Sequence, residues 1–171
     1  MSKLREFTVR ELVQSGFKGY TTFQSIRPQY AQGDGGIPRS PGVYAVLRAS
    51  TSPPQFLAKG FGGTHKARKA NVPIEQLEAK WVMDAGILYF GKASQRQNGG
   101  GLWDRINEYA TAGKGQKHGH SGGEHIWQLA DAKELLVAWK VVPSGTEKAV
   151  EDALLLAFRD KYGVLPFANR Q

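Results

Sequence analysis

The chain has 171 residues, and 40% of them are hydrophobic, which is enough for the core of one globular domain. Its 23 lysines and arginines exceed its 15 acidic residues, and the net charge of +8 favours a polyanionic partner such as nucleic acid. The lack of cysteine excludes disulfides, cysteine-ligated zinc, iron–sulfur clusters and thiol nucleophiles.

The first half of the chain contains a predicted helix, a predicted strand and a less regular segment. Residues 8–11 (Thr-Val-Arg-Glu) form a capping-box pattern, which predicts a short helix that ends at Gly16. The continuous apolar run 43–47 predicts a buried strand. Residues 51–85 are rich in turn formers and basic residues, and we expect one short helix there, around 74–81.

The second half of the chain alternates apolar runs with glycine-rich loops. Residues 86–90 predict a second strand, closed by Gly91. Apolar residues at i, i+4 and i+7 predict a helix over 101–112, and a loop rich in glycine and histidine follows over 113–123. The apolar run 135–142 predicts a third strand.

The last predicted element is a helix that begins with a second capping-box pattern, Ser144 and Glu147, and ends at Tyr162 before Gly163. Strands and helices occur without a regular β-α-β alternation, and no repeat or linker divides the chain. We therefore expect a single α+β domain that spans residues 1–171.

Glu151 is the clearest functional candidate in that helix. It falls inside an apolar stripe with Leu154 and Leu155. A carboxylate that faces a core is costly unless it is paired or binds a cation. The alternative is a glutamate at the edge of the stripe whose carboxylate reaches water. Glu147 is also acidic, but the capping box already accounts for it.

Arg105 and Tyr109 are spaced i, i+4 and therefore share one face of the helix predicted over 101–112. An arginine can hold a phosphate through two donors, whereas the alternative is an exposed arginine beside a core tyrosine. Lys92 follows the second strand, where a side chain can project over the edge of a sheet. It is equally compatible with an ordinary lysine at the end of a strand.

A zinc site is a further possibility in the histidine-rich loop, at His118, His120, His125 and Glu124. Their spacing lacks the helical H-x3-H pattern, and most of the surrounding residues are glycine. A flexible polar loop is the better interpretation. No phosphate-binding loop or serine-hydrolase motif is recognisable in the chain.

Several of these residues resemble the motifs of the GIY-YIG nuclease family, in the order and on the elements typical of that family. The matching segments are Gly42-Val43-Tyr44, Tyr89-Phe90-Gly91 with Lys92, Arg105 with Tyr109, Glu151, and Pro166-Phe167-Ala168-Asn169. The resemblance covers residues 42–48 and 86–169, and it implies a small three-stranded antiparallel sheet flanked by helices. Residues 1–41 would be an N-terminal extension.

The chain departs from the family pattern in two intervals. Tyr44 and Tyr89 are 45 residues apart, much further than the two tyrosines of the family motif, so residues 49–85 would be an insertion within the domain. The interval after Glu151 is also longer than in some members, which leaves Glu147 as a weaker alternative metal ligand.

The insertion is a candidate nucleic-acid contact because it is basic. Lysine and arginine side chains that neutralise phosphates supply most of the non-specific affinity for nucleic acid. The residues expected to do so are Lys59, Lys66, Arg68 and Lys69.

The resemblance implies phosphodiester hydrolysis by a one-metal mechanism. Glu151 would hold one Mg²⁺ or Mn²⁺, with water at the remaining positions. Tyr44 would be the general base, and Lys92 and the metal would stabilise its phenolate, since a tyrosine with an ordinary pKa near 10 is a poor base at pH 7. Arg105 would neutralise the charge that develops on the phosphate.

Three further residues complete the implied site: Tyr89 and Tyr109 would hydrogen-bond phosphate or water, and Asn169 would fix the geometry. The sequence thus predicts a metal-dependent endonuclease acting on DNA, with RNA left open, as a monomer or a homodimer. Because no signal peptide is recognisable and no apolar run approaches the roughly 20 residues of a membrane span, we expect a cytoplasmic protein without membrane contact.

Two other interpretations remain. One is a non-catalytic nucleic-acid-binding module that retains the GIY-YIG fold, and the other is an unrelated basic α+β protein. The nuclease interpretation requires Tyr44, Tyr89, Arg105 and Glu151 to converge within one cleft.

Overall fold

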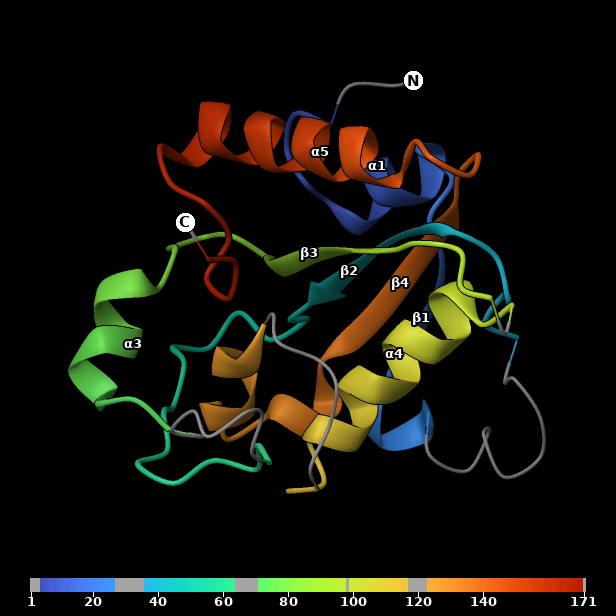
Figure 1. Cartoon of the computed structure of the whole chain (residues 1–171). Helices are drawn as coiled ribbons and strands as arrows, with labels where there is room; N and C mark the ends of the chain where they lie inside the picture. Colours follow the sequence, from blue (N-terminus) through green and yellow to red (C-terminus); the bar gives the residue numbers. More distant parts are fainter. Residues whose placement is uncertain (1–3, 27–35, 64–70, 98, 117–122, 171) are drawn as a thin grey trace.

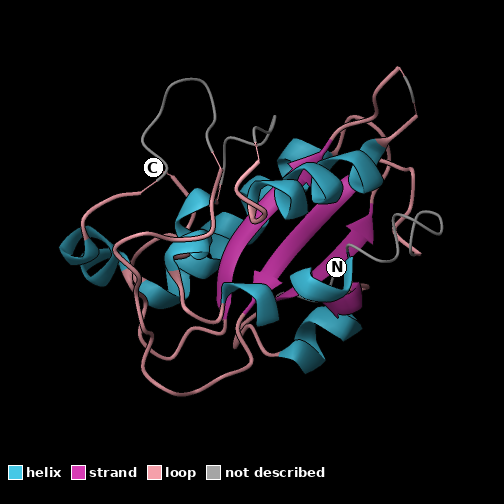
Figure 2. Cartoon of the chain, turned by 90° about the horizontal axis from the view of Figure 1, so that it is seen from below, coloured by secondary structure: helices cyan, strands magenta, loops and turns pink. Residues whose placement is uncertain are grey.

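The computed structural model shows a twisted sheet with helices on both faces (Figures 1 and 2). It describes residues 4–26, 36–63, 71–97, 99–116 and 123–170, and the structural statements below concern these ranges. The sheet is antiparallel throughout, with the strand order β1-β4-β2-β3. Its strands are β1 (Lys18–Thr22), β2 (Gly42–Leu47), β3 (Ile87–Ala93) and β4 (Leu136–Val141).

The central strand β2 separates two hydrophobic cores. All of its residues are buried, and it pairs with β3 on one side and with β4 on the other. Because side chains alternate along a strand, Tyr44 and Val46 belong to one core, whereas Val43 and Ala45 belong to the other. The continuous apolar run of β2 therefore reflects burial on both faces.

Helices cover both faces of this sheet. In Figure 1, α1 (Val9–Gln14) and α5 (Glu147–Tyr162) lie above the sheet and α4 (Gly101–Ala112) lies below it. Leu154 and Phe158 pack α5 onto the core that contains Val43 and Ala45. Further helices are α3 (Ile74–Lys80) and the two 3-10 helices η1 (Glu124–Gln128) and η2 (Ala132–Glu134).

The predicted helices are confirmed at nearly the predicted positions, including those around 74–81 and over 101–112. The first capping pattern is also confirmed, since the Thr8 hydroxyl accepts a hydrogen bond from the Glu11 backbone N–H at 3.2 Å. Gly163 ends α5 in the left-handed conformation, as a C-terminal glycine does in many helices. Local patterns were sufficient to place these elements.

The second capping pattern is wrong in detail. The residue before the first turn of α5 is Thr146, which makes no side-chain capping bond. Glu147 instead accepts a hydrogen bond from the backbone N–H of Gly145 at 3.0 Å. Ser144 is therefore not the N-cap, although the helix begins where the pattern places it.

The sheet has four strands, and the predicted number of three is wrong. Strand β1 lacks the apolar alternation on which strand prediction depends, because it is an edge strand with exposed and half-exposed residues. Its pairing with β4 is also irregular between Gly19 and Thr21. Tyr20, between them, has a φ of 59°. This irregularity breaks the period of two that would have revealed the strand.

The described part of the predicted insertion, 49–85, packs into the domain. The buried amide of Gln128 accepts a hydrogen bond from Val72 N–H at 2.9 Å and donates one to the Val72 carbonyl at 2.9 Å. The ring of Phe56 stacks on that of Phe167, with 5.7 Å between the ring centres. No helix within the described ranges is long and apolar enough to cross a membrane.

Candidate active site

Four of the predicted site residues line one open pocket of about 290 Å³. Tyr89 and Lys92 come from β3, Arg105 from α4 and Glu151 from α5. Because β3 is an edge strand, groups carried by helices on opposite faces of the sheet can meet beside it. The structure therefore brings together side chains that are far apart in the sequence.

Tyr44 is fully buried behind Tyr89. Their ring centres are 5.9 Å apart, and the two side chains are hydrogen-bonded to each other. Burial raises the pKa of Tyr44 well above its usual value, and it also raises the pKa of Tyr89, while the nearby charge of Arg105 acts in the opposite direction on both. Both groups are protonated phenols near pH 7. Tyr44 does not line the pocket, so three of the four side chains that the nuclease interpretation requires in one cleft meet there.

Tyr109 does not line the pocket. The side chain is fully buried, and its hydroxyl donates a hydrogen bond to the Gly123 carbonyl at 2.7 Å. Its ring centre lies 6.2 Å from that of Tyr44 and 5.6 Å from that of Tyr89. Tyr109 therefore supports the other two tyrosines from within the core.

Arg105 lies at the pocket wall on α4. Its Nη1 donates a hydrogen bond to Oε2 of Glu108, three residues further along the helix, at 3.2 Å. Both side chains are partly exposed, at 24% and 26%. The guanidinium is thus held in place by a neighbouring carboxylate while it remains accessible from the pocket.

The Glu151 carboxylate is partly buried and surrounded by cations. Burial raises its pKa, whereas Lys92, Lys148 and Arg105 lower it. Among the described residues, no ion pair within 4.0 Å neutralises this carboxylate. A partly buried carboxylate without such a partner gains stability by binding a cation.

Glu151 is the only carboxylate among the described residues that line the pocket. No cluster of three or more His, Asp or Glu side chains that could hold a metal occurs among the described residues. A single carboxylate can hold Mg²⁺ only when water or substrate oxygens fill the other positions. Glu147, the alternative ligand, is 4% exposed, accepts the Gly145 N–H and does not line the pocket.

Asn169 forms hydrogen bonds with the edge of β3 that no other described strand pairs with. Its Oδ1 accepts a hydrogen bond from Phe90 N–H at 3.0 Å, and its Nδ2 donates one to the Phe90 carbonyl at 2.8 Å. The Ala168 N–H donates to the Leu88 carbonyl at 2.9 Å. The amide thus replaces a neighbouring strand beside Tyr89, and Asn169 is a positioning residue for the site.

The basic insertion is only partly described. Lys59 is exposed, as a nucleic-acid contact requires. His125 is partly buried in η1, and its Nδ1 has no hydrogen-bond partner among the described residues. Glu124 is paired with Arg170 at 2.9 Å. Five other predicted residues of these two segments lie outside the described ranges: Lys66, Arg68, Lys69, His118 and His120.

Sequence analysis missed Arg96, which lines the same pocket as Arg105. It belongs to the loop between β3 and α4, a segment without periodicity or a recognisable motif. The signal available in the sequence was its place shortly after Lys92, within reach of the end of β3. The residue that pairs with it, Glu108, could be identified only from the structure.

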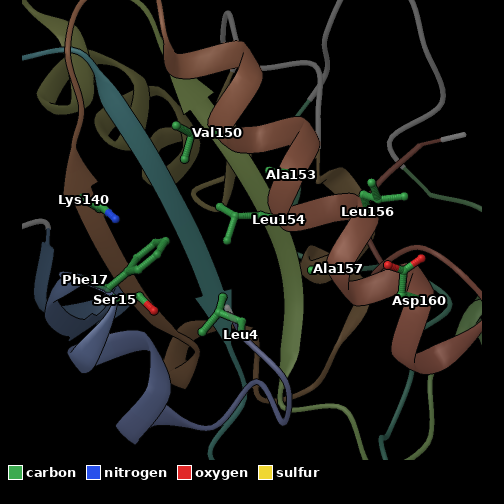
Figure 3. A pocket seen from close by; sticks show the side chains of 10 residues that line it. All are labelled: Leu4, Ser15, Phe17, Lys140, Val150, Ala153, Leu154, Leu156, Ala157 and Asp160. Carbon is green, nitrogen blue, oxygen red and sulfur yellow. The ribbon is translucent and has the colours of Figure 1, made fainter. Parts of the chain in front are cut away.

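A larger pocket of about 420 Å³ lies between α5 and the segment around α1 (Figure 3). Its lining is mainly apolar, and its charged members are Lys140 and Asp160. Val150 and Glu151 line different pockets, because successive helix positions point about 100° apart. The apolar pocket holds none of the predicted site residues, so the chemistry is assigned to the smaller one.

Comparisons of the chain with protein families, with curated proteins and with solved structures found no match. The resemblance to the GIY-YIG motifs therefore depends on the residues quoted above. The function has to be argued from the chemistry of the pocket, since a fold by itself does not determine an activity.

Proposed function

We propose that the protein is a metal-dependent endonuclease that hydrolyses phosphodiester bonds of nucleic acid, with DNA as its substrate. One observation carries this proposal: Tyr89, Arg105 and Glu151 meet in one pocket, with Tyr44 hydrogen-bonded behind it. Hydrolysis of a phosphodiester needs a cation on the phosphate, an acceptor for the proton of water and a ligand for a metal. These side chains supply all three.

The pocket is suited to an anion. Its charged lining consists of three cations, Lys92, Arg96 and Arg105, and one carboxylate, Glu151. In the proposed reaction Arg105 donates hydrogen bonds to the phosphate oxygens, where a guanidinium provides two parallel donors. It thereby stabilises the charge that increases on these oxygens in the transition state.

Glu151 would hold the Mg²⁺ or Mn²⁺ ion. When bound, such an ion supplies positive charge to the phosphate and to the leaving oxygen. The carboxylate must be ionised for this role, and the charges of Lys92 and Arg105 favour that form against the effect of burial.

We assign the role of proton acceptor for the attacking water to the Tyr44–Tyr89 pair. The sequence resemblance implied that Tyr44 makes the first contact with water. Because Tyr89 lines the pocket and Tyr44 is buried, we assign this contact to Tyr89 instead. Burial and the charge of Glu151 raise the pKa of Tyr89, whereas the hydrogen bond from Tyr44 and the charge of Arg105 lower it, and the net change is a rise. Tyr89 would therefore have to lose its own proton before it could accept one from water.

The alternative function is a nucleic-acid-binding module that does not cut. The specific observation in its favour is the complete burial of Tyr44, which raises its pKa and keeps it protonated. The cations of the pocket would bind a phosphate backbone equally well without hydrolysis.

Cleavage of supercoiled plasmid in Mg²⁺ or Mn²⁺ tests the proposal. Wild-type protein should nick or linearise the plasmid, and both Glu151→Gln and Arg105→Gln should lose this activity. Glu147→Gln and Asp152→Asn are the matched controls, since Glu147 precedes Glu151 by one helical turn and Asp152 is its exposed neighbour. Both controls should cut like the wild type.

Each result has a defined meaning. Salt-sensitive DNA binding without cleavage by the wild type would favour the binding module. Cleavage that survives both pocket substitutions would place the activity elsewhere. Loss of cleavage in Glu147→Gln but not in Glu151→Gln would make Glu147 the metal ligand in place of Glu151.

A further inference from the structure

Arg96 gives the pocket a second guanidinium beside that of Arg105. It lies in the loop that follows β3, and its side chain is 39% exposed, so a ligand in the pocket can reach it. Arg96 is not one of the predicted catalytic residues, although it lines the same pocket as four of them.

Glu108 holds Arg96 and Arg105 on one carboxylate. Nη1 and Nη2 of Arg96 donate to the two oxygens of Glu108 at 2.6 and 3.1 Å. Nη1 of Arg105 donates to Oε2 at 3.2 Å, and Asp104 lies 3.6 Å from Nη1 of Arg96. A guanidinium has five N–H donors, so the bidentate contact leaves Arg96 with donors for another anion.

Resting on the proposed function, we propose that Arg96 binds a second phosphate of the same nucleic-acid strand, next to the phosphate held by Arg105. Glu108 is the positioning residue that fixes the two guanidiniums relative to each other. Two arginines joined by one carboxylate can each bind a different phosphate. The site is therefore built for a polynucleotide rather than for an isolated phosphodiester.

The alternative is that the ion pair between Arg96 and Glu108 only stabilises the loop after β3. A partly exposed ion pair contributes about 0–1 kcal/mol to folding stability, so substitutions at Arg96 or Glu108 should leave the protein folded. An effect on phosphate binding would then report a contact with the ligand, which a purely structural ion pair would not produce.

Binding of a short DNA duplex, measured in EDTA over a range of salt concentrations, tests the subsite without any cleavage. Arg96→Gln should weaken binding and lower the slope of log Kd against log salt by about one, because one phosphate contact is lost. Glu108→Gln removes a competing negative charge, so its slope should not fall, but it should weaken binding because the two guanidiniums lose their fixed relative position. The control is Lys161→Gln, which removes an ion-paired cation ten residues beyond Glu151 on α5 and should leave the slope unchanged.

Cleavage of two substrates provides a second readout. Bis(p-nitrophenyl) phosphate contains one phosphodiester, whereas plasmid DNA presents consecutive phosphates. Arg96→Gln should slow the cleavage of DNA, mainly through a raised KM, by a larger factor than the cleavage of the small diester. Arg105→Gln should lose activity on both substrates.

If Arg96→Gln has the same salt slope as the wild type, the second phosphate site is wrong. If Arg96→Gln loses activity equally on both substrates, the proposal is also wrong, because Arg96 would then act at the reacting phosphate. If the wild type binds DNA without cutting it and the slope still falls in Arg96→Gln, the subsite stands and the nuclease proposal fails. If the wild type binds no DNA, both proposals fail. Where the small diester is not cleaved at all, the slope alone decides.

Discussion

Gly91 faces Tyr44 directly across the β2–β3 pair, and the missing side chain of Gly91 provides the space that the Tyr44 ring fills. A Cβ at Gly91 would overlap Cζ of this ring and lie 2.5 Å from its hydroxyl oxygen. The glycine is therefore required by the position of the tyrosine, because a packed core does not absorb an added methyl group without displacement.

Gly91→Ala should destabilise the protein by about 1–3 kcal/mol, through overpacking against Tyr44, and should reduce any cleavage activity. Urea unfolding measures the first effect. Gly86→Ala is the matched control, since the nearest atom to a Cβ there is the Arg48 carbonyl oxygen at 3.8 Å, an ordinary contact. Equal unfolding free energies for both variants would contradict this account of Gly91.

Asn169→Asp should destabilise the protein by about 1–3 kcal/mol, because it removes the donor to the buried Phe90 carbonyl and places a charge beside it. Hydrogen exchange at the Phe90 amide should accelerate in the same variant. Asn71→Asp is the control, because its Oδ1 accepts from Gly60 N–H at 2.9 Å and a carboxylate can replace that acceptor. The expectation fails if both variants unfold at the same urea concentration.

The acidic limb of the pH–activity profile should depend on Lys92. In the proposed reaction Glu151 must be ionised to hold the cation, so activity should fall as the pH drops through the raised pKa of Glu151. Lys92 lowers this pKa, and Lys92→Gln should therefore move the acidic limb to higher pH, whatever the maximal rate. Lys161→Gln should leave the limb in place. If the acidic limb does not move in Lys92→Gln, the ionisation of Glu151 does not control the activity.

His125 should make folding stability sensitive to mild acid. Burial, with Lys80 and Arg170 nearby, lowers the pKa of His125 from 6.5 to about 4. Between these two values the unfolded chain binds a proton that the folded protein does not, so stability should decrease as the pH falls. We expect a loss of about 1–2 kcal/mol after solvent screening is allowed for.

The measurement for this prediction is the unfolding free energy of wild type and His125→Gln at several values between pH 7 and pH 4. The difference between the two proteins isolates the imidazole from other groups that titrate in the range. Parallel curves would show that the ring is accessible to protons in the folded state.

The elements that sequence patterns predicted correctly are those buried on a regular face. The runs that became β2, β3 and β4 are continuous and apolar, and α4 repeats its apolar residues with helical spacing. β1 was missed because an irregular edge strand buries too little to leave a pattern. Local sequence thus reports burial better than it reports hydrogen bonding.

The candidate site shows a similar division. The motifs indicated Arg105 and Glu151, and the structure places both at one pocket. The motifs did not indicate that the Tyr109 hydroxyl is bonded to Gly123, or that Arg96 shares Glu108 with Arg105. These contacts depend on how loops return to the sheet, which residue spacing alone does not specify.

The position of Asn169 in the chain, with its two hydrogen bonds to Phe90, also affects when the pocket can form during synthesis. A chain emerges from the ribosome with its N-terminal part first, so β2 and β3 are available long before Glu151 and Asn169. Until Glu151 has emerged the pocket lacks its carboxylate, and until Asn169 has emerged the edge of β3 lacks the two hydrogen bonds of that amide. The pocket can therefore be completed only after residues 151 and 169 have both been synthesised.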